Sequence, residues 1–327
     1  MANITKLCCL YSSSEFPGRP SWMHSFSQAP NAVVLDDRVR VFICCRPEAD
    51  QDGMYVSRFG YIDLDINEPT NVVGFSPNSI LALGKTGEFD EFGTYPVSVY
   101  KEDSDKLIAA YGGWTRCTSV PFDISIGLAF SSNGGESFER FGSGPILTKN
   151  LLDPFVITSP KLRKFQGKWY LFYTCGTKWI TDKSGKPEII YKIKVATSSD
   201  LVNWNRDGDT LIQARLGEDE AQACPDVFQI NGTFHMFYCY RRSLDFRKNI
   251  EATYRIGHAI SKDLYHWEIT SFADDFAPSF DGFDNEMVAY PNIFELDNSF
   301  FLLYAGNGNG RDGIGIAEVV GLYDVEV

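Results

Sequence analysis

Short apolar runs alternate with turn residues along the whole chain, and the pattern recurs about every 65 residues. Apolar runs of four to eight residues between turn residues are typical of buried strands. After each recurrence comes an aromatic-rich run, at 41–45 (VFICC), 108–112 (IAAYG), 170–174 (YLFYT), 235–239 (HMFYC) and 301–305 (FLLYA). A proline precedes each of these units, at Pro30, Pro96, Pro160, Pro225 and Pro291.

A repeat of this length that contains several strands predicts a radial array of small sheets. Five units fit into 327 residues, so we predict an all-β, five-bladed β-propeller with four-stranded antiparallel blades and almost no helix. The fifth unit ends with its third strand at 313–319. We therefore expect residues 5–11 to complete the last blade, which removes the open sheet edges. The repeat reaches the end of the chain, so we expect one domain over residues 1–327.

Composition narrows the classes of function. The net charge of −13 argues against a nucleic-acid partner, because phosphate binding needs a basic surface. No apolar run approaches the roughly 18 residues that cross a bilayer, and residues 1–16 lack the pattern of a signal peptide. The eight cysteines form no C-x-x-C pair and mostly lie in strand patterns, which indicates reduced thiols in a cytoplasmic protein.

We expect neither a metal nor another cofactor. No cluster of histidine and cysteine has zinc spacing. Residues 308–313 match the G-x-G-x-x-G pattern of dinucleotide sites, but they connect two predicted strands. Without a helix N-terminus to bind phosphate, the pattern indicates a hairpin.

Carboxylates recur at one position of the repeat, five residues before the proline. Glu91, Glu220 and Glu286 occupy this position in units two, four and five, whereas the third unit has Asp153 two residues further back. The innermost strand of each blade faces the axis, so these four side chains are predicted to surround one axial cavity as catalytic groups. Glycosidic bond cleavage needs such a set, with one carboxyl group donating a proton and another activating water or attacking carbon.

Glu220 lies beside other acidic residues and a cationic loop, so we expect it to be the base or nucleophile. Glu286 precedes an apolar run, so we expect it to be the proton donor. Nothing in the sequence suggests that either side chain stabilises the core. Any one of these carboxylates can equally be an ordinary solvent-facing group.

Basic and aromatic residues cluster after the second strand of each unit. Aromatic rings stack on sugar rings, and arginine binds carboxylate or phosphate through two hydrogen bonds, so these residues suggest an anionic group in the ligand. The alternative is that each arginine pairs with a nearby carboxylate. The candidate binding residues are His24, Arg46, Trp114, Arg116, Lys178, Tyr240, Arg241, Arg242, Arg247 and Asn307.

The turns at 132–138, 199–204 and 262–267 resemble the Asp-box turns of sialidase-type propellers, and we expect them to be structural hairpins. Together with the P-x-(V/I)-F strands, they resemble the five-bladed propeller glycosidases, which include arabinanases, xylosidases, invertases and mannoside phosphorylases. The segments EAQACPDVF (220–228) and DNEMVAYPNIF (284–294) are more similar still to uncharacterised glycosidase-like proteins encoded with bacterial surface-polysaccharide functions.

This resemblance implies an enzyme that acts on a glycosidic bond by hydrolysis, phosphorolysis or transfer. Arabinanase-like members carry an aspartate at the start of blade one, where this chain has residues 24–28 (HSFSQ). Catalysis has therefore moved to other blades, or hydrolysis has been lost and the protein is a non-catalytic carbohydrate-binding propeller. A protein-interaction scaffold is the weakest alternative, because it needs no carboxylates at a common position. The expected ligand is a carbohydrate or sugar phosphate, and the oligomeric state stays open.

Overall fold

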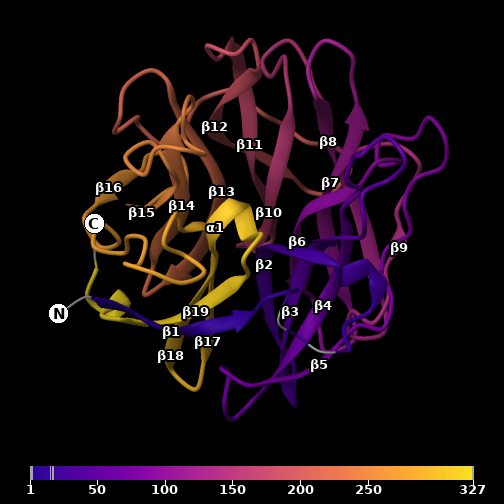
Figure 1. Ribbon diagram of the computed structural model, residues 1–327. Helices are drawn as coiled ribbons and strands as arrows, with labels where there is room; N and C mark the ends of the chain where they lie inside the picture. Colours follow the sequence, from indigo (N-terminus) through magenta and orange to yellow (C-terminus); the bar gives the residue numbers. More distant parts are fainter. Residues whose placement is uncertain (1–2, 15, 17, 326–327) are drawn as a thin grey trace.

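The computed structural model describes residues 3–14, 16 and 18–325, and within them the chain is an all-β, five-bladed propeller, as the repeat predicted (Figure 1). Blade one contains β2 (Ser25–Val34), β3 (Arg38–Arg46), β4 (Arg58–Asp65) and β5 (Val72–Phe75). Blade two contains β6 (Thr94–Lys101), β7 (Leu107–Arg116), β8 (Phe122–Ser131) and β9 (Glu139–Arg140). Blade three contains β10 (Ile157–Phe165), β11 (Lys168–Thr181) and β12 (Pro187–Ser198).

Blade four contains β13 (Glu220–Ile230), β14 (Thr233–Arg242), β15 (Arg255–Ser261) and β16 (Glu268–Thr270). Blade five contains β17 (Ala289–Leu296), β18 (Ser299–Ala305), β19 (Ile314–Val320) and β1 (Asn3–Tyr11). The helical segments in the described residues are short: η1 (Ser21–Met23), α1 (Asn307–Gly310) and η2 (Leu322–Asp324). None of these helices is long and apolar enough to cross a membrane.

The N-terminal strand closes the ring. β1 pairs antiparallel with β19, from Asn3 opposite Val320 to Tyr11 opposite Ile314, and the two chain ends lie on the same side of the molecule (Figure 1). Lys6 in β1 also bonds to the Asp284 carboxylate at 2.6 Å, which ties the strand to the loop before β17. The predicted closure of blade five is therefore confirmed.

Blade three departs from the prediction of four strands in every blade. Its sheet has three strands, and beyond β12 only an isolated bridge between Thr197 and Asn205 continues the ladder. The intervening turn is closed by Asp200, whose carboxylate accepts hydrogen bonds from the Val202 and Asn203 amides. This is one of the predicted structural hairpins.

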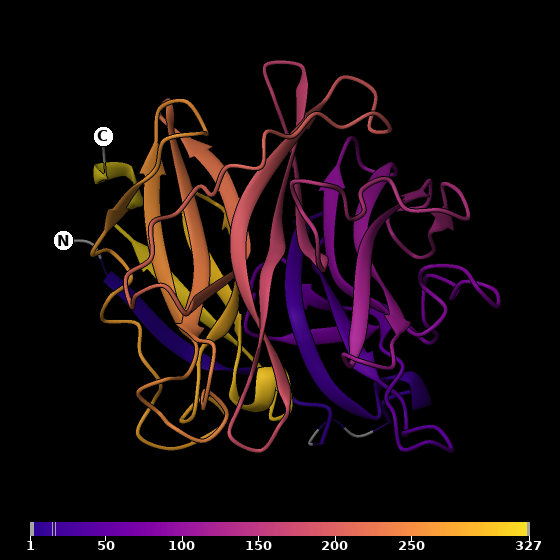
Figure 2. The same ribbon diagram turned by 90° about the horizontal axis from the view of Figure 1, so that it is seen from above.

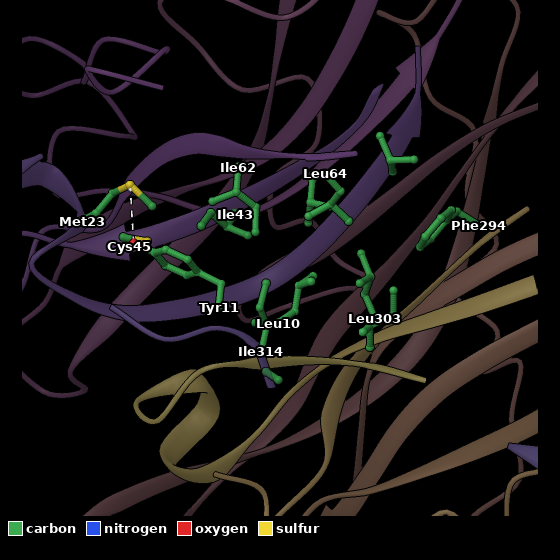
Figure 3. Packing of buried hydrophobic residues seen from close by; sticks show 14 of the residues in the cluster. Leu10, Tyr11, Met23, Ile43, Cys45, Ile62, Leu64, Phe294, Leu303 and Ile314 are labelled. Carbon is green, nitrogen blue, oxygen red and sulfur yellow. Dashed lines mark hydrogen bonds between the residues drawn. The ribbon is translucent and has the colours of Figure 1, made fainter. Parts of the chain in front are cut away.

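The core lies between neighbouring blades. Figure 3 shows the layer between blade one and blade five, where Tyr11 and Ile314 of blade five pack against Ile43 and Ile62 of blade one. These side chains are at most 1% exposed. Burying an aliphatic or aromatic side chain of this size contributes about 1.5–3 kcal/mol, so the layer holds the two ends of the ring together.

The inner strand of every blade is irregular at its proline. The ladder to the second strand shifts at this point in β2, β6, β10, β13 and β17. In four blades the residue before the proline has a positive φ, between 48° and 57°: Ala29, Ser159, Cys224 and Tyr290. A bulge of this kind bends a strand and redirects its side chains, here beside the axis.

A buried polar ring links the blades just after the prolines. Asn31 accepts a hydrogen bond from the Val99 amide of the next blade, and Asn292 accepts one from the Ala32 amide. Asp226 accepts from the Ile293 amide and pairs with Lys161 at 2.6 Å. Further around the ring, Ser98 accepts from the Leu162 amide. The repeat therefore encodes both the blades and the contacts that join them.

Candidate functional site

A cavity of about 330 Å³ lies on the propeller axis and is lined by residues from all five blades. A narrower hollow of about 30 Å³, bordered by the five repeat prolines, lies next to it along the axis. Pro96, Ser159 and Tyr290 border both spaces, so they mark the base of the larger cavity. The opposite, open end is formed by the β11–β12 hairpin and by the loop after β14.

The cavity wall offers polar atoms that lack partners among the described residues. Gln28 donates a hydrogen bond from Nε2 to the Asn309 carbonyl at 2.9 Å. The buried Gln28 Oε1 and Asn309 Oδ1 atoms, however, have no hydrogen-bond partner within the described part of the protein. A buried polar group without a partner is costly, so these acceptors suit a ligand that brings hydroxyl donors.

Two arginines on the cavity wall, Arg46 and Arg241, also have polar atoms without partners among the described residues. The Arg46 guanidinium lies over the rings of Phe26 and Tyr55, at 4.0 and 5.1 Å from the ring centres. Arg241, only 2% exposed, lies 3.6 Å over the ring of Phe246. Within the described residues neither arginine has a carboxylate at ion-pair distance, and the Nε atom of each is buried without a partner.

Burial lowers the pKa of Arg46, but a guanidinium stays charged in proteins. Two unpaired cations in a chain with a net charge of −13 favour an anionic group in the ligand.

Aromatic rings form a continuous wall around the cavity. At the base, the Tyr290 ring lies 6.2 Å from those of both Tyr95 and Tyr254. Burial raises the pKa of Tyr95 and Tyr290 well above its usual value, so their hydroxyl groups stay protonated and act as donors. Towards the open end, the Phe122 ring lies 4.5 Å from Trp114 and 5.9 Å from Trp179.

Glu188 supplies the only carboxylate among the described residues that line the cavity. It is 8% exposed and forms ion pairs with Arg247 and, at 3.3 Å, with Lys186. With Arg46 and Arg241, the lining carries four cationic side chains against one anionic side chain. No group of three or more potential metal ligands was found among the described residues.

The four predicted catalytic carboxylates do not converge on this cavity. Glu220 is fully buried; its Oε2 accepts hydrogen bonds from the Arg215 and Leu216 amides, both at 2.7 Å, and its Oε1 accepts one from Gln222. Glu91 accepts a hydrogen bond from the Gly87 amide in a turn.

Glu286, whose side chain is 54% exposed, pairs with Arg311 at 3.4 Å. Asp153 is fully buried and bonds to Tyr173, Lys194 and Arg206. None of the four carboxylates is among the described lining residues, so the predicted convergence is wrong. Their assignment as catalytic groups stays a prediction.

A structural role explains why acidic residues recur with the repeat. The second strands of blades two, three and five each carry a buried tyrosine at the same position, and its hydroxyl group needs an acceptor. Tyr111 donates to Asp90 at 2.9 Å, Tyr173 to Asp153 at 2.8 Å, and Tyr304 to Asp284 at 3.1 Å. These three carboxylates lie in the loops that lead into the inner strands β6, β10 and β17.

Four of the ten predicted binding residues line the cavity: Arg46, Trp114, Arg241 and Arg247. For Arg116 the alternative prediction holds, that an arginine pairs with a nearby carboxylate and does not bind a ligand. Arg116 bonds to Asp50 and stacks on Phe92. The other predicted residues do not line the cavity. Lys178 and Arg242 are exposed, and Tyr240 packs beside Arg215. His24 borders a separate surface hollow, and the Asn307 side chain accepts a hydrogen bond from the Glu286 amide.

Several lining residues were not predicted as binding residues. Tyr95 and Tyr290 stand directly before repeat prolines, and that position, rather than the one five residues back, faces the cavity. Gln28 and Asn309 carry the unpartnered acceptors. Glu188 lies at the start of β12, beside the β11–β12 hairpin, and was not among the carboxylates that the repeat brought to attention.

Comparison with known proteins supports the fold. No protein-family model matches the chain. An uncharacterized protein of Mycobacterium tuberculosis, Rv1502, is 29% identical over 302 residues, which cover 92% of this chain and 94% of that protein.

Among solved structures, a thermostable family-43 glycoside hydrolase is 16% identical with a TM-score of 0.64, over 94% of this chain and 91% of its own. A putative glycosidase of Bacteroides thetaiotaomicron is 16% identical with a TM-score of 0.68, covering 97% of this chain and 96% of its own. A structure described with the GH130 family of mannoside phosphorylases is 15% identical with a TM-score of 0.69, over 97% and 92%. The chain therefore shares the five-bladed propeller fold of glycoside hydrolases and mannoside phosphorylases.

Proposed function

We propose that this protein acts on a glycosidic bond of a carbohydrate that carries an anionic group, and that it binds this ligand in the axial cavity. One observation carries the proposal: four buried polar atoms without protein partners belong to residues of this one cavity. Gln28 Oε1 and Asn309 Oδ1 suit sugar hydroxyl groups, and the Nε atoms of Arg46 and Arg241 suit the anion. The aromatic wall suits the apolar faces of a sugar ring.

The charges in the cavity favour transfer to or from phosphate over hydrolysis. Hydrolysis ordinarily uses two carboxyl groups, one for the leaving oxygen and one for water or for attack on carbon. Glu188 is one such group, placed in a predominantly cationic lining. A phosphate oxygen is already anionic, so it attacks a sugar carbon without a base. The two unpaired arginines would bind the phosphate, and Glu188 would donate a proton to the oxygen of the leaving sugar and take it back in the reverse reaction.

A non-catalytic carbohydrate-binding propeller is the second candidate. It is favoured by the ion pairs that Glu188 makes with Arg247 and Lys186, because a carboxylate held by two cations is poorly suited to donating a proton. The cysteine pattern supports a cytoplasmic setting for either function, and the resemblance to proteins encoded with polysaccharide genes supports a role in polysaccharide biosynthesis.

The test is one panel measured in two ways. Neutral glycosides, glycosyl 1-phosphates and sugar nucleotides are assayed for binding by calorimetry and for turnover by product analysis. We expect anionic ligands to bind more tightly than the matching neutral sugars, and Arg241→Met to weaken their binding at least about tenfold. Glu188→Gln should lower turnover about a hundredfold, the usual scale for a general acid or base.

Arg116→Met is the matched control, because Arg116 is not among the residues that line the cavity and pairs with the partly exposed Asp50 carboxylate. Binding of a ligand without turnover would favour the second candidate, a non-catalytic carbohydrate-binding propeller. Binding that does not distinguish anionic from neutral sugars, or that survives Arg241→Met, would refute the proposal.

A further inference from the structure

The axial cavity changes character from its base to its open end. The base carries amide and hydroxyl groups, including those of Gln28, Ser159 and Thr174. The open end is lined by Phe122, Trp179 and prolines and isoleucines of the neighbouring segments, together with the charged Lys186, Glu188 and Arg247. Trp179 lies near the end of β11, in the hairpin that projects beside α1 at one end of the propeller (Figure 2). A ligand that fills this cavity needs a polar end and a flat apolar end.

A second sugar unit fits the open end poorly. Sugar hydroxyl groups are bound through hydrogen bonds, and burying them against apolar walls without partners costs free energy. The rings of Trp114, Phe122 and Trp179 contact one another at 4.5 and 5.9 Å and present flat surface. Such a surface suits a ring with two apolar faces, and stacking on aromatic side chains is the usual way in which proteins bind a nucleobase.

Cations line the cavity in a number that suits more than one phosphate. The guanidinium groups of Arg241 and Arg247 both contact the ring of Phe246, at 3.6 and 4.0 Å from its centre, so they flank one side chain. Arg46 adds a third guanidinium, near Tyr95 and Tyr290. One of the three charges is balanced by Glu188, which leaves two for the ligand.

We propose that the ligand of the axial cavity is a nucleoside diphosphate sugar. The sugar would lie at the polar base, the diphosphate among Arg46, Arg241 and Arg247, and the base on Trp179 and Phe122 at the open end. This inference rests on the proposed function and narrows its substrate class. If the ligand also reacts, the glycosyl unit passes to an acceptor hydroxyl group. The bond from the anomeric carbon to phosphate breaks, and the nucleoside diphosphate leaves with the bonding pair. The bond to the acceptor oxygen forms, and the Glu188 carboxylate takes the proton that the acceptor hydroxyl group loses.

The experiment compares ligands that differ only in the nucleoside. Calorimetry measures binding of uridine, guanosine and thymidine diphosphate sugars, of the matching glycosyl 1-phosphates, and of aryl glycosides without phosphate. We expect at least one nucleoside diphosphate sugar to bind at least tenfold more tightly than its glycosyl 1-phosphate. Trp179→Ala should remove roughly 5- to 100-fold of that affinity, the usual range for one stacked base, and leave glycosyl 1-phosphate binding within about twofold.

Trp179 is partly exposed, and Phe122 is its only recorded ring contact in the described residues, so Trp179→Ala should fold; a thermal melt checks this. Phe280→Ala, at a fully exposed phenylalanine that does not line the cavity, is the matched control and should change nothing. Equal affinity for glycosyl 1-phosphates and nucleoside diphosphate sugars would overturn this inference and leave the proposed function standing. Aryl glycosides that bind as tightly without phosphate would overturn both.

Discussion

A buried histidine pair in blade four should make the protein unstable in mild acid. His235 Nδ1 lies 3.2 Å from His258 Nε2, and His258 Nδ1 lies 2.7 Å from the Thr270 hydroxyl. The two rings are 1% and 0% exposed and pack against phenylalanines such as Phe228. Burial lowers the pKa of His235 to about 4 and that of His258 to about 3, and the neighbouring ring further lowers the latter.

The sign of the effect follows from proton binding. In the unfolded chain both pKa values return to about 6.5, so between about pH 6.5 and pH 4 the unfolded state binds two more protons than the folded state. The stability that the neutral pair contributes is therefore present above pH 6.5 and is lost as the pH falls. At pH 5 the pH is about 1.5 units below the unfolded-state pKa of each histidine. This lowers the free energy of unfolding by about 2 kcal/mol per residue and by about 4 kcal/mol for the pair.

Urea unfolding at pH 7.5, 6.0 and 5.0 measures this cost, with the double variant His235→Gln/His258→Gln as reference. Glutamine does not titrate, so the free energy of unfolding should fall less steeply in the variant, by about 2.5 kcal/mol between pH 6 and pH 5. The comparison depends on the slope, so a lower absolute stability of the variant does not affect it. Equal slopes for the two proteins would refute the reasoning.

Three substitutions test the frame of the propeller by urea unfolding at pH 7.5. Lys6→Met should lower the free energy of unfolding by about 2 kcal/mol, because it leaves the buried Asp284 carboxylate without its cation; a loss below about 0.5 kcal/mol would show that closure does not depend on this pair. Asp226→Asn should cost about 3 kcal/mol by leaving the buried Lys161 without a counter-ion, and an unchanged urea midpoint would contradict this. Glu220→Gln should cost about 1–3 kcal/mol, because an amide cannot replace every hydrogen bond that the carboxylate accepts; lower turnover at unchanged stability would instead support its predicted catalytic role.

The fold was predictable because the information for it is repeated five times. The prolines, the apolar strands and the aromatic second strands recur at one interval, and each recurrence confirms the others. The closure by the N-terminal strand, predicted at residues 5–11 and observed at Asn3–Tyr11, followed from counting strands, since the fifth unit lacks one. The missing strand of blade three was not predictable in this way, because residues 199–212 contain a regular Asp turn and only the folded chain shows that no ladder follows it.

The structural role of Glu220 explains why the predicted convergence of the glutamates on the cavity was wrong. The sequence suggested that Glu220 and Glu286 have no part in the core. For Glu220 this expectation is wrong, because its carboxylate is buried and accepts two backbone amide hydrogen bonds. Tyr95 and Tyr290 do line the cavity, and both stand directly before a repeat proline in the sequence. A bulge at each proline turns these side chains to the axis, and this backbone irregularity, which includes a positive φ at Tyr290, is not visible in an amino-acid pattern.

The division between periodic and non-periodic residues has a physical basis. A structural feature that several blades share, such as an acceptor for the buried tyrosine hydroxyl group of blades two, three and five or a polar link to the next blade, recurs with the repeat. A ligand without five-fold symmetry needs different groups from different blades. The proposed ligand would therefore be bound where the repeats differ: at Tyr95 and Tyr290, where two other blades have Ala29 and Cys224, at Glu188 beside the β11–β12 hairpin, and at Arg247 in the loop after β14. In a propeller of this kind, departures from the repeat are better guides to the binding site than the repeat itself.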